Sequence, residues 1–268
     1  MEGMRDYRVV ARNTATTSAN KIHDDAVARQ YGFGGGLVPG VDVYAYLTHP
    51  PAEAGGRDWL ARGTLQARFL TPAYEDDELV VAVGDAGALE VRKADGTVCA
   101  VGRATLPADP DPADAVALSD PAWAGAEPPD PTVRPPAASP ETLVPGTAFA
   151  LPPKTFHAAK AGEYLADVRE GLPLYPEAGL AHPAWLLRDA NYVLSANVAL
   201  GPWIHVESVT RHHGLVTDGT TLEVRVTVLR EWEHKGHRFV ELDVAMFGDG
   251  DLVMRVNHTA IHTPRRSA

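Results

Sequence analysis

The residues of this chain best suited to chemistry lie together near its start, at positions 18–25. His23 carries an imidazole whose ordinary pKa lies near neutrality, which is the property that a general base requires. Ser18 and Asn20 precede it within five residues, and Asp25 follows two residues later. A hydroxyl, an amide and a carboxylate therefore accompany the imidazole, and we treat these four residues as a candidate catalytic group.

The order of these residues resembles the hydratase motif of the MaoC-like dehydratases and (R)-specific enoyl-CoA hydratases. The family pattern is Asp-x-Asn-Pro-x-His-x-Asp, followed by an alanine, a Gly-Phe pair and an Ile-x-His-Gly that enters a buried helix. The positions that match this pattern are Asn20, Ile22, His23, Asp25, Gly32, Phe33 and Gly40. Three positions depart from it, because Ser18 replaces the catalytic aspartate, Lys21 the proline and Pro39 the histidine.

The resemblance implies a hydro-lyase that adds or removes water on a CoA- or carrier-linked acyl thioester, without a metal or another cofactor. His23 would act as the base and Asn20 would orient its loop. The backbone N–H groups of Gly40 and Val41, at the start of the helix, would polarise the thioester carbonyl with the help of the helix dipole. Gly36 ends a run of three glycines that allows the backbone to approach a ligand closely.

The serine at position 18 leaves three interpretations open. Asp24 or Asp25 takes the place of the aspartate, although carboxylates just before a helix also favour its N-terminus without any catalysis. Alternatively, the reaction needs only a histidine, as in thioester hydrolysis or the dehydration of a substrate with a more acidic proton. In the third interpretation the site binds without reacting. A hotdog acyl-CoA thioesterase and a non-catalytic acyl-binding or assembly subunit are therefore the alternatives to a hydratase.

Two stretches of the chain repeat one plan that would position these residues. Each begins with an apolar segment in which proline stands at or just before the first helical position, at 39–47 and at 182–197. Alternating, β-branched segments follow, at 64–71, 78–84, 88–93 and 97–106 and again at 203–210, 221–233, 237–247 and 252–262. Such alternation predicts strands with one buried face. The pattern gives a tandem α+β architecture, and the family resemblance identifies it as a double hotdog fold.

The segment between the two stretches is rich in proline. Eleven of the twenty-two prolines lie between positions 107 and 145, a composition typical of an extended linker. We therefore predict an N-terminal hotdog at 1–106 that carries the motif, a linker at 107–145 and a C-terminal hotdog at 146–268 that shapes the acyl pocket. The two sheets are expected to lie side by side, because pairing covers an otherwise open sheet edge.

Other side chains receive simpler interpretations. His182 and His205 are predicted to line the pocket where the two halves meet and to contact substrate. The histidines at 212, 213, 234 and 237 lie beside turns and are expected to be solvated, and no histidine spacing indicates a metal site. Most aromatic residues are expected in the core, with those on helices available to wall an acyl tunnel.

Composition limits the partners of the protein. The net charge is −11, and the only Lys/Arg cluster is Arg265-Arg266, so a nucleic-acid partner is not expected. A phosphorylated ligand such as CoA would therefore need a locally basic site. The single cysteine, Cys99, excludes an intramolecular disulfide and fits a reducing compartment. With no apolar run of membrane-spanning length, we expect a cytoplasmic protein without membrane contact, and a homodimer is one assembly left open.

Overall fold

Two sets of strands form one antiparallel sheet in the computed structural model, which describes residues 3–123 and 125–266. The first set comprises β1 (Tyr7–Val10), β2 (Thr64–Phe69), β3 (Glu78–Val83), β4 (Ala88–Lys93) and β5 (Val98–Thr105). The second set comprises β6 (Ala148–Ala150), β7 (Lys154–Thr155), β8 (Ile204–His212), β9 (Thr221–His234), β10 (His237–Gly248) and β11 (Asp251–Thr263). Alternate side chains of the long strands are buried, as the sequence pattern predicts.

The order of the strands shows that the two halves follow one plan. From its outer edge inward the first half runs β1-β3-β4-β5-β2, and the second runs β6-β9-β10-β11-β8. In each half the strand before the central helix is outermost and the strand after it is innermost. The innermost strands β2 and β8 pair with each other, with Ala67 opposite Ser208, so that each covers the inner edge of the other. The predicted double hotdog architecture is confirmed.

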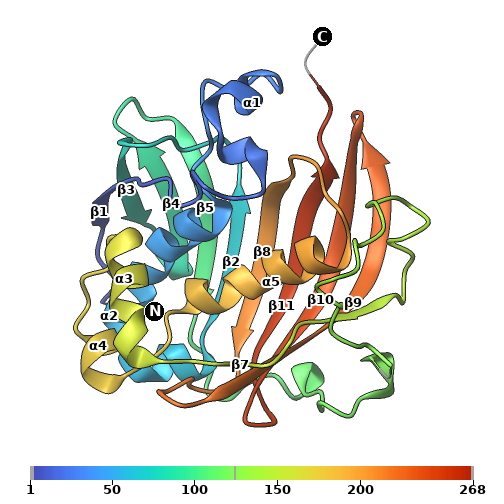
Figure 1. Ribbon diagram of the computed structural model, residues 1–268. Coiled ribbons are helices and arrows are strands. Elements are labelled where there is room, and N and C mark those ends of the chain that lie inside the picture. The colour runs from blue at the N-terminus through green and yellow to red at the C-terminus, as the bar shows by residue number, and fades with distance from the viewer. Residues whose placement is uncertain (1–2, 124, 267–268) are drawn as a thin grey trace.

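The helices α2 (Gly40–Arg62) and α5 (Pro183–Asn197) occupy equivalent places in the two halves and lie on the same side of the sheet (Figure 1). The first two turns of α2 are buried because the helix packs against both the sheet and α5. Tyr44 of α2 contacts Thr210 of β8 through hydroxyl oxygens 2.7 Å apart, which ties the first helix to the second half. Gly56 interrupts α2 with a φ of 55° that favours glycine.

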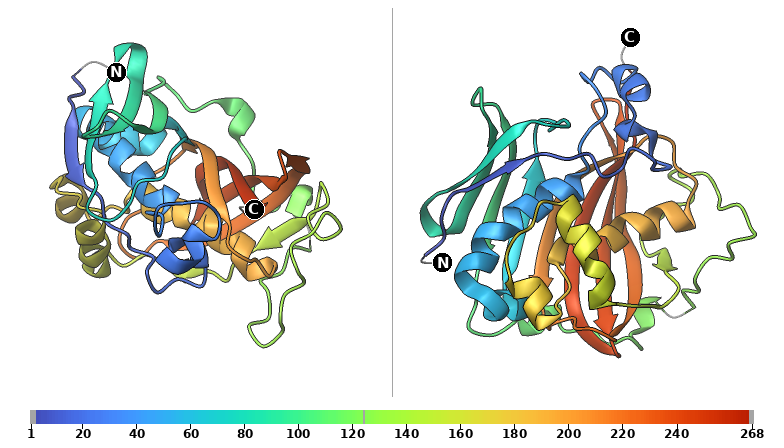
Figure 2. Two further views of the ribbon diagram at one scale, coloured as in Figure 1. Left: turned by 90° about the horizontal axis from the view of Figure 1, so that it is seen from above. Right: turned by 60° about the vertical axis from the view of Figure 1, so that its left-hand side comes forward.

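Shorter helices cover the ends and the open side of these layers (Figure 2). They are α1 (Asp25–Arg29), α3 (Ala158–Asp167) and α4 (Leu174–Ala178). The connections also contain the 3₁₀ turns η1 (Lys21–His23), η2 (Asp85–Gly87), η3 (Pro112–Asp114) and η4 (Pro121–Trp123). Within residues 3–123 and 125–266, none of the helices combines the length and the hydropathy of a membrane-spanning segment.

The proline-rich segment is more than a connection. Its described residues form mainly turns and extended chain, and two side chains among them are buried. Trp123 packs against Phe247 of β10 with ring centroids 6.1 Å apart, and Leu143 is buried in the main core. The expectation of a purely extended linker was therefore incomplete, because a large apolar side chain on each side of the prolines attaches the segment to the second half.

Candidate active site

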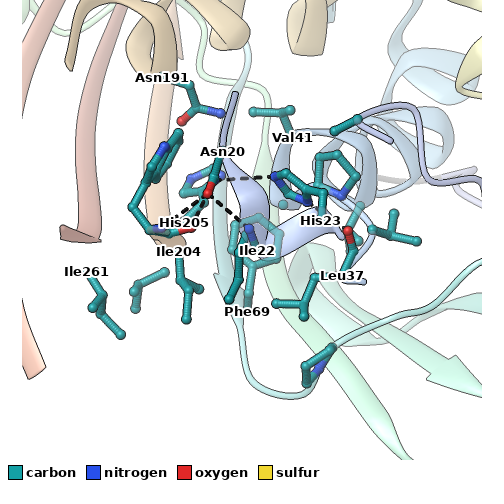
Figure 3. Close-up of a pocket in the computed structure, with 18 of the residues that line it drawn as sticks. Asn20, Ile22, His23, Leu37, Val41, Phe69, Asn191, Ile204, His205 and Ile261 are labelled. Carbon is teal, nitrogen blue, oxygen red and sulfur yellow. Dashed lines mark hydrogen bonds between the residues drawn. The ribbon is translucent and has the colours of Figure 1, made fainter. Parts of the chain in front are cut away.

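A cavity of about 830 Å³ opens where the two halves meet. Its wall combines residues 14–23, the start of α2, the end of β2 and the loop after it, one face of α5, the start of β8 and the turn between β9 and β10. Most of the wall is apolar, and the candidate catalytic loop forms one side of it (Figure 3). Segments that are far apart in the sequence therefore form this site together.

His23 lines the cavity with a defined tautomer. Its Nδ1 lies 2.7 Å from the carbonyl oxygen of Leu37, which can only accept a hydrogen bond, so Nδ1 carries the proton and Nε2 is the basic nitrogen. Burial lowers the pKa of His23 below its ordinary value, against a smaller opposing effect of the bond to Leu37. The imidazole is therefore neutral near pH 7 and able to accept a proton.

Asn20 fixes the position of this loop against the other half of the molecule. Its Oδ1 accepts hydrogen bonds from the N–H of Trp203, at 3.1 Å, and of Ile22, at 3.3 Å. Its Nδ2 donates to the carbonyl oxygen of Trp203 at 2.9 Å and lies 3.4 Å from His23 Nε2 (Figure 3). Because both polar atoms of the Asn20 side chain bond the backbone before β8, the loop with His23 is held at a fixed place between the halves.

The start of α2 presents backbone amides to the same cavity. Pro39 provides no side-chain hydrogen bond to cap the helix, and the amides of Gly40 and Val41 have no acceptor within the helix because they belong to its first turn. Both residues line the cavity. Two N–H groups without an acceptor in the helix, and the positive end of a helix dipole, therefore lie beside the cavity.

Ser18 lies in the cavity wall. Its Oγ accepts a hydrogen bond from the N–H of Asn20 at 3.1 Å, so it supports the loop while its own proton stays available. Among the described residues, the lining includes no aspartate or glutamate. It does include Arg68, Arg188 and Lys235, so the site is locally basic in an acidic protein, as a phosphorylated ligand requires.

Two predicted site residues support the catalytic loop from outside the cavity. Asp25 accepts a hydrogen bond from the N–H of Gly36 at 2.8 Å and pairs with Arg29, while Asp24 caps α1. A Cβ on Gly36 would lie 2.1 Å from the carbonyl oxygen of His23. The close backbone approach that the glycine run predicted is therefore to His23 and not to a ligand. The placement of Asp25 and Gly36 in the site is corrected accordingly.

His182 also lies outside the cavity, in contrast to its predicted role in binding substrate. The Nδ1 of this buried side chain accepts a hydrogen bond from the N–H of Ala184 at 3.1 Å and caps α5. Its Nε2 lies 3.2 Å from Thr48 Oγ1 and 3.7 Å from the carboxylate of Glu170. Burial opposes ionisation of Glu170, but its bonds to His182 and His49 outweigh burial and lower its pKa to about 2. The start of α5 is buried in the core, and the imidazole of His182 satisfies a backbone N–H there.

The histidines of β8 differ from each other. His205 lines the cavity, as predicted, and is buried beneath it. His212 was expected to be solvated but is only 2% exposed, because its ring packs edge-on against Trp59 and its Nδ1 lies 3.0 Å from the Trp59 carbonyl oxygen. His234 and His237 lie at the solvent-facing turn between β9 and β10 and also line the cavity.

The polar face that α5 presents to the cavity was not predicted from the sequence. Four residues spaced at three or four positions along this helix line the cavity, namely Arg188, Asn191, Tyr192 and Ser195. This spacing predicts one helix face, so the stripe was detectable in the sequence. In the same wall, burial raises the pKa of Cys99 to about 11, which makes a thiolate nucleophile unfavourable. The described residues contain no cluster of three or more side chains suited to a metal ion.

No protein-family model matches the sequence, and no curated protein is similar to it. Solved structures do resemble it. A conserved hypothetical protein of Mycobacterium tuberculosis with a double hotdog fold superposes with a TM-score of 0.64 and 16% identity, over 97% of this chain and 96% of the other. A protein of Chloroflexus aurantiacus, proposed to be a MaoC-domain dehydratase, gives a TM-score of 0.60 and 12% identity over 100% and 97%. A proposed thioesterase of Novosphingobium aromaticivorans gives 0.54 and 13% over 97% and 96%. At these identities the comparisons show the double hotdog fold.

Proposed function

We propose that this chain is a MaoC-like acyl-thioester hydratase or dehydratase that acts on a CoA- or carrier-linked substrate. The observation that carries the proposal is the position of the neutral base. His23 has its Nδ1 proton bonded to Leu37, and its Nε2, 3.4 Å from Asn20 Nδ2, is the nitrogen that can take a proton, in a cavity shared with the open start of α2. A base and a carbonyl-polarising helix start in one cavity are what hydration of an enoyl thioester requires.

The reaction can proceed with one proton-transfer group. His23 Nε2 takes a proton from water as the water oxygen bonds to Cβ of the enoyl thioester, and negative charge moves to the thioester oxygen. The amides of Gly40 and Val41 stabilise that charge. The imidazolium of His23 then returns the proton to Cα, which gives the 3-hydroxyacyl thioester. Dehydration is the same sequence in reverse, with His23 taking the Cα proton and delivering it to the departing hydroxide.

The cations of the wall support the choice of substrate carrier. Arg68 and Lys235 are exposed at the cavity, where no aspartate or glutamate of the described chain lines the wall. Phosphate groups of CoA or of a carrier's phosphopantetheine fit such a rim, because two positive charges line a wall that no carboxylate lines, although Glu207 stands opposite Arg68 on the paired strand.

A thioesterase is the second candidate, and the lining without a carboxylate favours it. Thioester hydrolysis needs one base to activate water and donors for the carbonyl oxygen, and both are present without the aspartate that the hydratase motif uses. Water would attack the thioester carbon while His23 takes its proton, and the sulfur would leave with that proton as a free thiol.

One assay separates these functions. The protein is incubated with crotonyl-CoA and, separately, with 3-hydroxybutyryl-CoA, while enoyl absorbance and free thiol are recorded together. Change in enoyl absorbance without thiol supports the hydratase or dehydratase, whereas thiol release supports the thioesterase. Saturable binding without either signal contradicts both enzymes and leaves a non-catalytic acyl-binding subunit.

A further inference from the structure

The strongest unexplained feature of the molecule is the side chain of His205. It lines the cavity, yet it is only 6% exposed, and its Nδ1 has no hydrogen-bond partner among the described residues. The ring packs directly against the start of α2, since a Cβ built on Gly40 would lie 2.9 Å from this Nδ1. A buried polar atom without a partner is costly, so this nitrogen at a ligand cavity indicates a contact made by a ligand.

Behind His205 lies a second buried histidine, connected through a serine. His205 Nε2 lies 2.8 Å from Ser208 Oγ, and the same oxygen lies 3.0 Å from His258 Nδ1. Ser208 and His258 are fully buried on the paired strands β8 and β11. Burial, and then the charge of His258, lower the pKa of His205 well below its ordinary value, against a smaller effect of the Glu207 backbone. Burial lowers the pKa of His258 to about 3, so both rings are neutral.

The hydroxyl of Ser208 allows only two proton arrangements among the three hydrogen-bonded side chains of His205, Ser208 and His258. The hydroxyl has one proton, which it donates to one ring while it accepts a proton from the other. If Ser208 donates to His205, then His205 carries its proton on Nδ1 and His258 donates from its own Nδ1. If Ser208 donates to His258, the proton of His258 moves to Nε2, where the structure shows no partner. Each arrangement leaves one ring N–H without an acceptor among the described residues, on Nδ1 of His205 in the first and on Nε2 of His258 in the second. Of these two rings His205 lines the cavity and His258 does not, so the first arrangement is the one in which a bound ligand can accept that proton.

We propose that His205 is a third hydrogen-bond donor to the carbonyl oxygen of the acyl thioester, beside the amides of Gly40 and Val41. Ser208 and His258 act as positioning residues that keep the proton of His205 on Nδ1. The inference rests on the proposed acyl-thioester substrate. A neutral donor suits this place, since it polarises a carbonyl without adding a charged group next to the positive end of the helix dipole.

Binding of two non-reactive CoA analogues tests the proposal without any turnover. Both have a methylene in place of the sulfur; one keeps the carbonyl of butyryl-CoA and the other has a second methylene there. The wild type should bind the carbonyl analogue more tightly in calorimetry. His205→Phe, which keeps a ring without nitrogen, should reduce this preference by about 2–10-fold, the usual effect of one hydrogen bond. His205→Asn, which keeps a donor near the Nδ1 position, should retain most of it.

His212→Phe is the matched control, because it removes a buried histidine from the same strand outside the cavity. An unchanged preference in a folded His205→Phe protein overturns the inference and leaves the proposed function intact. A preference that depends on His205 in a protein inactive on crotonyl-CoA supports the inference and contradicts the enzyme. If the wild type binds neither analogue, both proposals are overturned.

Nuclear magnetic resonance tests the role of the serine directly. Long-range ¹H–¹⁵N spectra of the protein labelled at histidine report which ring nitrogen carries the proton. With the carbonyl analogue bound, we expect His205 as the Nδ1–H tautomer in the wild type and a mixture of tautomers in Ser208→Ala, in which the fixed donor is lost. An analogue-bound wild-type His205 with its proton on Nε2, or a tautomer unaffected by Ser208→Ala, contradicts the positioning role of Ser208.

Discussion

The helix that begins at Gly40 and the helix that begins at Pro183 occupy equivalent places in the two halves, yet only the first begins at the cavity. At α5 the imidazole of His182 accepts the N–H of Ala184 and the helix start is buried. At α2 the preceding residue is Pro39, which offers no side-chain cap. The repeated fold therefore supplies two helix starts, and the side-chain cap at the start of α5 leaves only the start of α2 available to a ligand.

The two halves also differ in what they add around the open helix start. The first half contributes the loop with Asn20 and His23, whereas the second contributes the anchoring backbone of Trp203 and the buried pair of His205 and Ser208. Neither half forms the cavity alone. The second half thus supports a site whose proposed base and amides belong to the first.

The largest effect is expected from removing the base. His23→Ala should lower kcat by a factor on the order of 10²–10⁴, because proton transfer from a positioned side chain contributes about that much. Steady-state kinetics on whichever thioester is turned over give the value, and thermal melting checks the fold. A His23→Ala protein with an unchanged rate would place the chemistry outside the motif of the first half.

Breaking the contact between the halves should have the next largest effect. Asn20→Ala removes all the hydrogen bonds to Trp203, and displacement of His23 by about 1 Å is expected to lower kcat roughly 10²-fold. The exposed neighbour Lys21, changed to alanine, is the matched control in the same loop. Equal rates for the two variants would show that the second half does not hold the base.

A carboxylate at position 18 should raise the rate of enoyl hydration. Ser18→Asp keeps an acceptor for the N–H of Asn20 and places an acid in the cavity wall. We expect enoyl hydration to rise more than about tenfold, which corresponds to ~1.4 kcal/mol of transition-state stabilisation. If the change slows the native reaction instead, the serine belongs to a different mechanism, such as thioester hydrolysis.

The pH dependence should report the burial of His23. Only the neutral imidazole accepts a proton, so kcat/KM rises with pH through the pKa of His23 and is level above it. Because burial lowers that pKa below 6.5, the midpoint should lie below 6.5. A rate that still rises above pH 7 would mean that another group, or a solvated histidine, is the base.

The smallest effect on rate is expected at the sealed helix start. His182→Ala removes the acceptor of Ala184 and one partner of Glu170, so it should lower the free energy of unfolding by about 1–3 kcal/mol. The rate per folded molecule should be unchanged, because His182 lies outside the cavity lining. Urea unfolding and kinetics on the same preparation measure both quantities. A large fall in kcat with normal stability would show that the second helix start takes part in the reaction.

The sequence predicts the fold well because alternation and helix starts are local signals. The strand from Thr221 to His234 and the turn at Lys235-Gly236 follow from neighbouring residues alone. The pairing of Ser208 with His258 does not, since it depends on the register between β8 and β11, which no local pattern specifies. The motif located the cavity through His23 and Asn20, but it could not distinguish Asp25, which bonds the Gly36 amide, from a residue in the wall.

A crystal structure with the carbonyl-bearing butyryl-CoA analogue described above tests most directly that the site lies at the open helix start. We expect its carbonyl oxygen within hydrogen-bond distance of the Gly40 or Val41 amide and its acyl carbons beside His23 Nε2. A ligand bound at the start of α5, or bound in the cavity with its carbonyl turned away from α2 and His23, would contradict it.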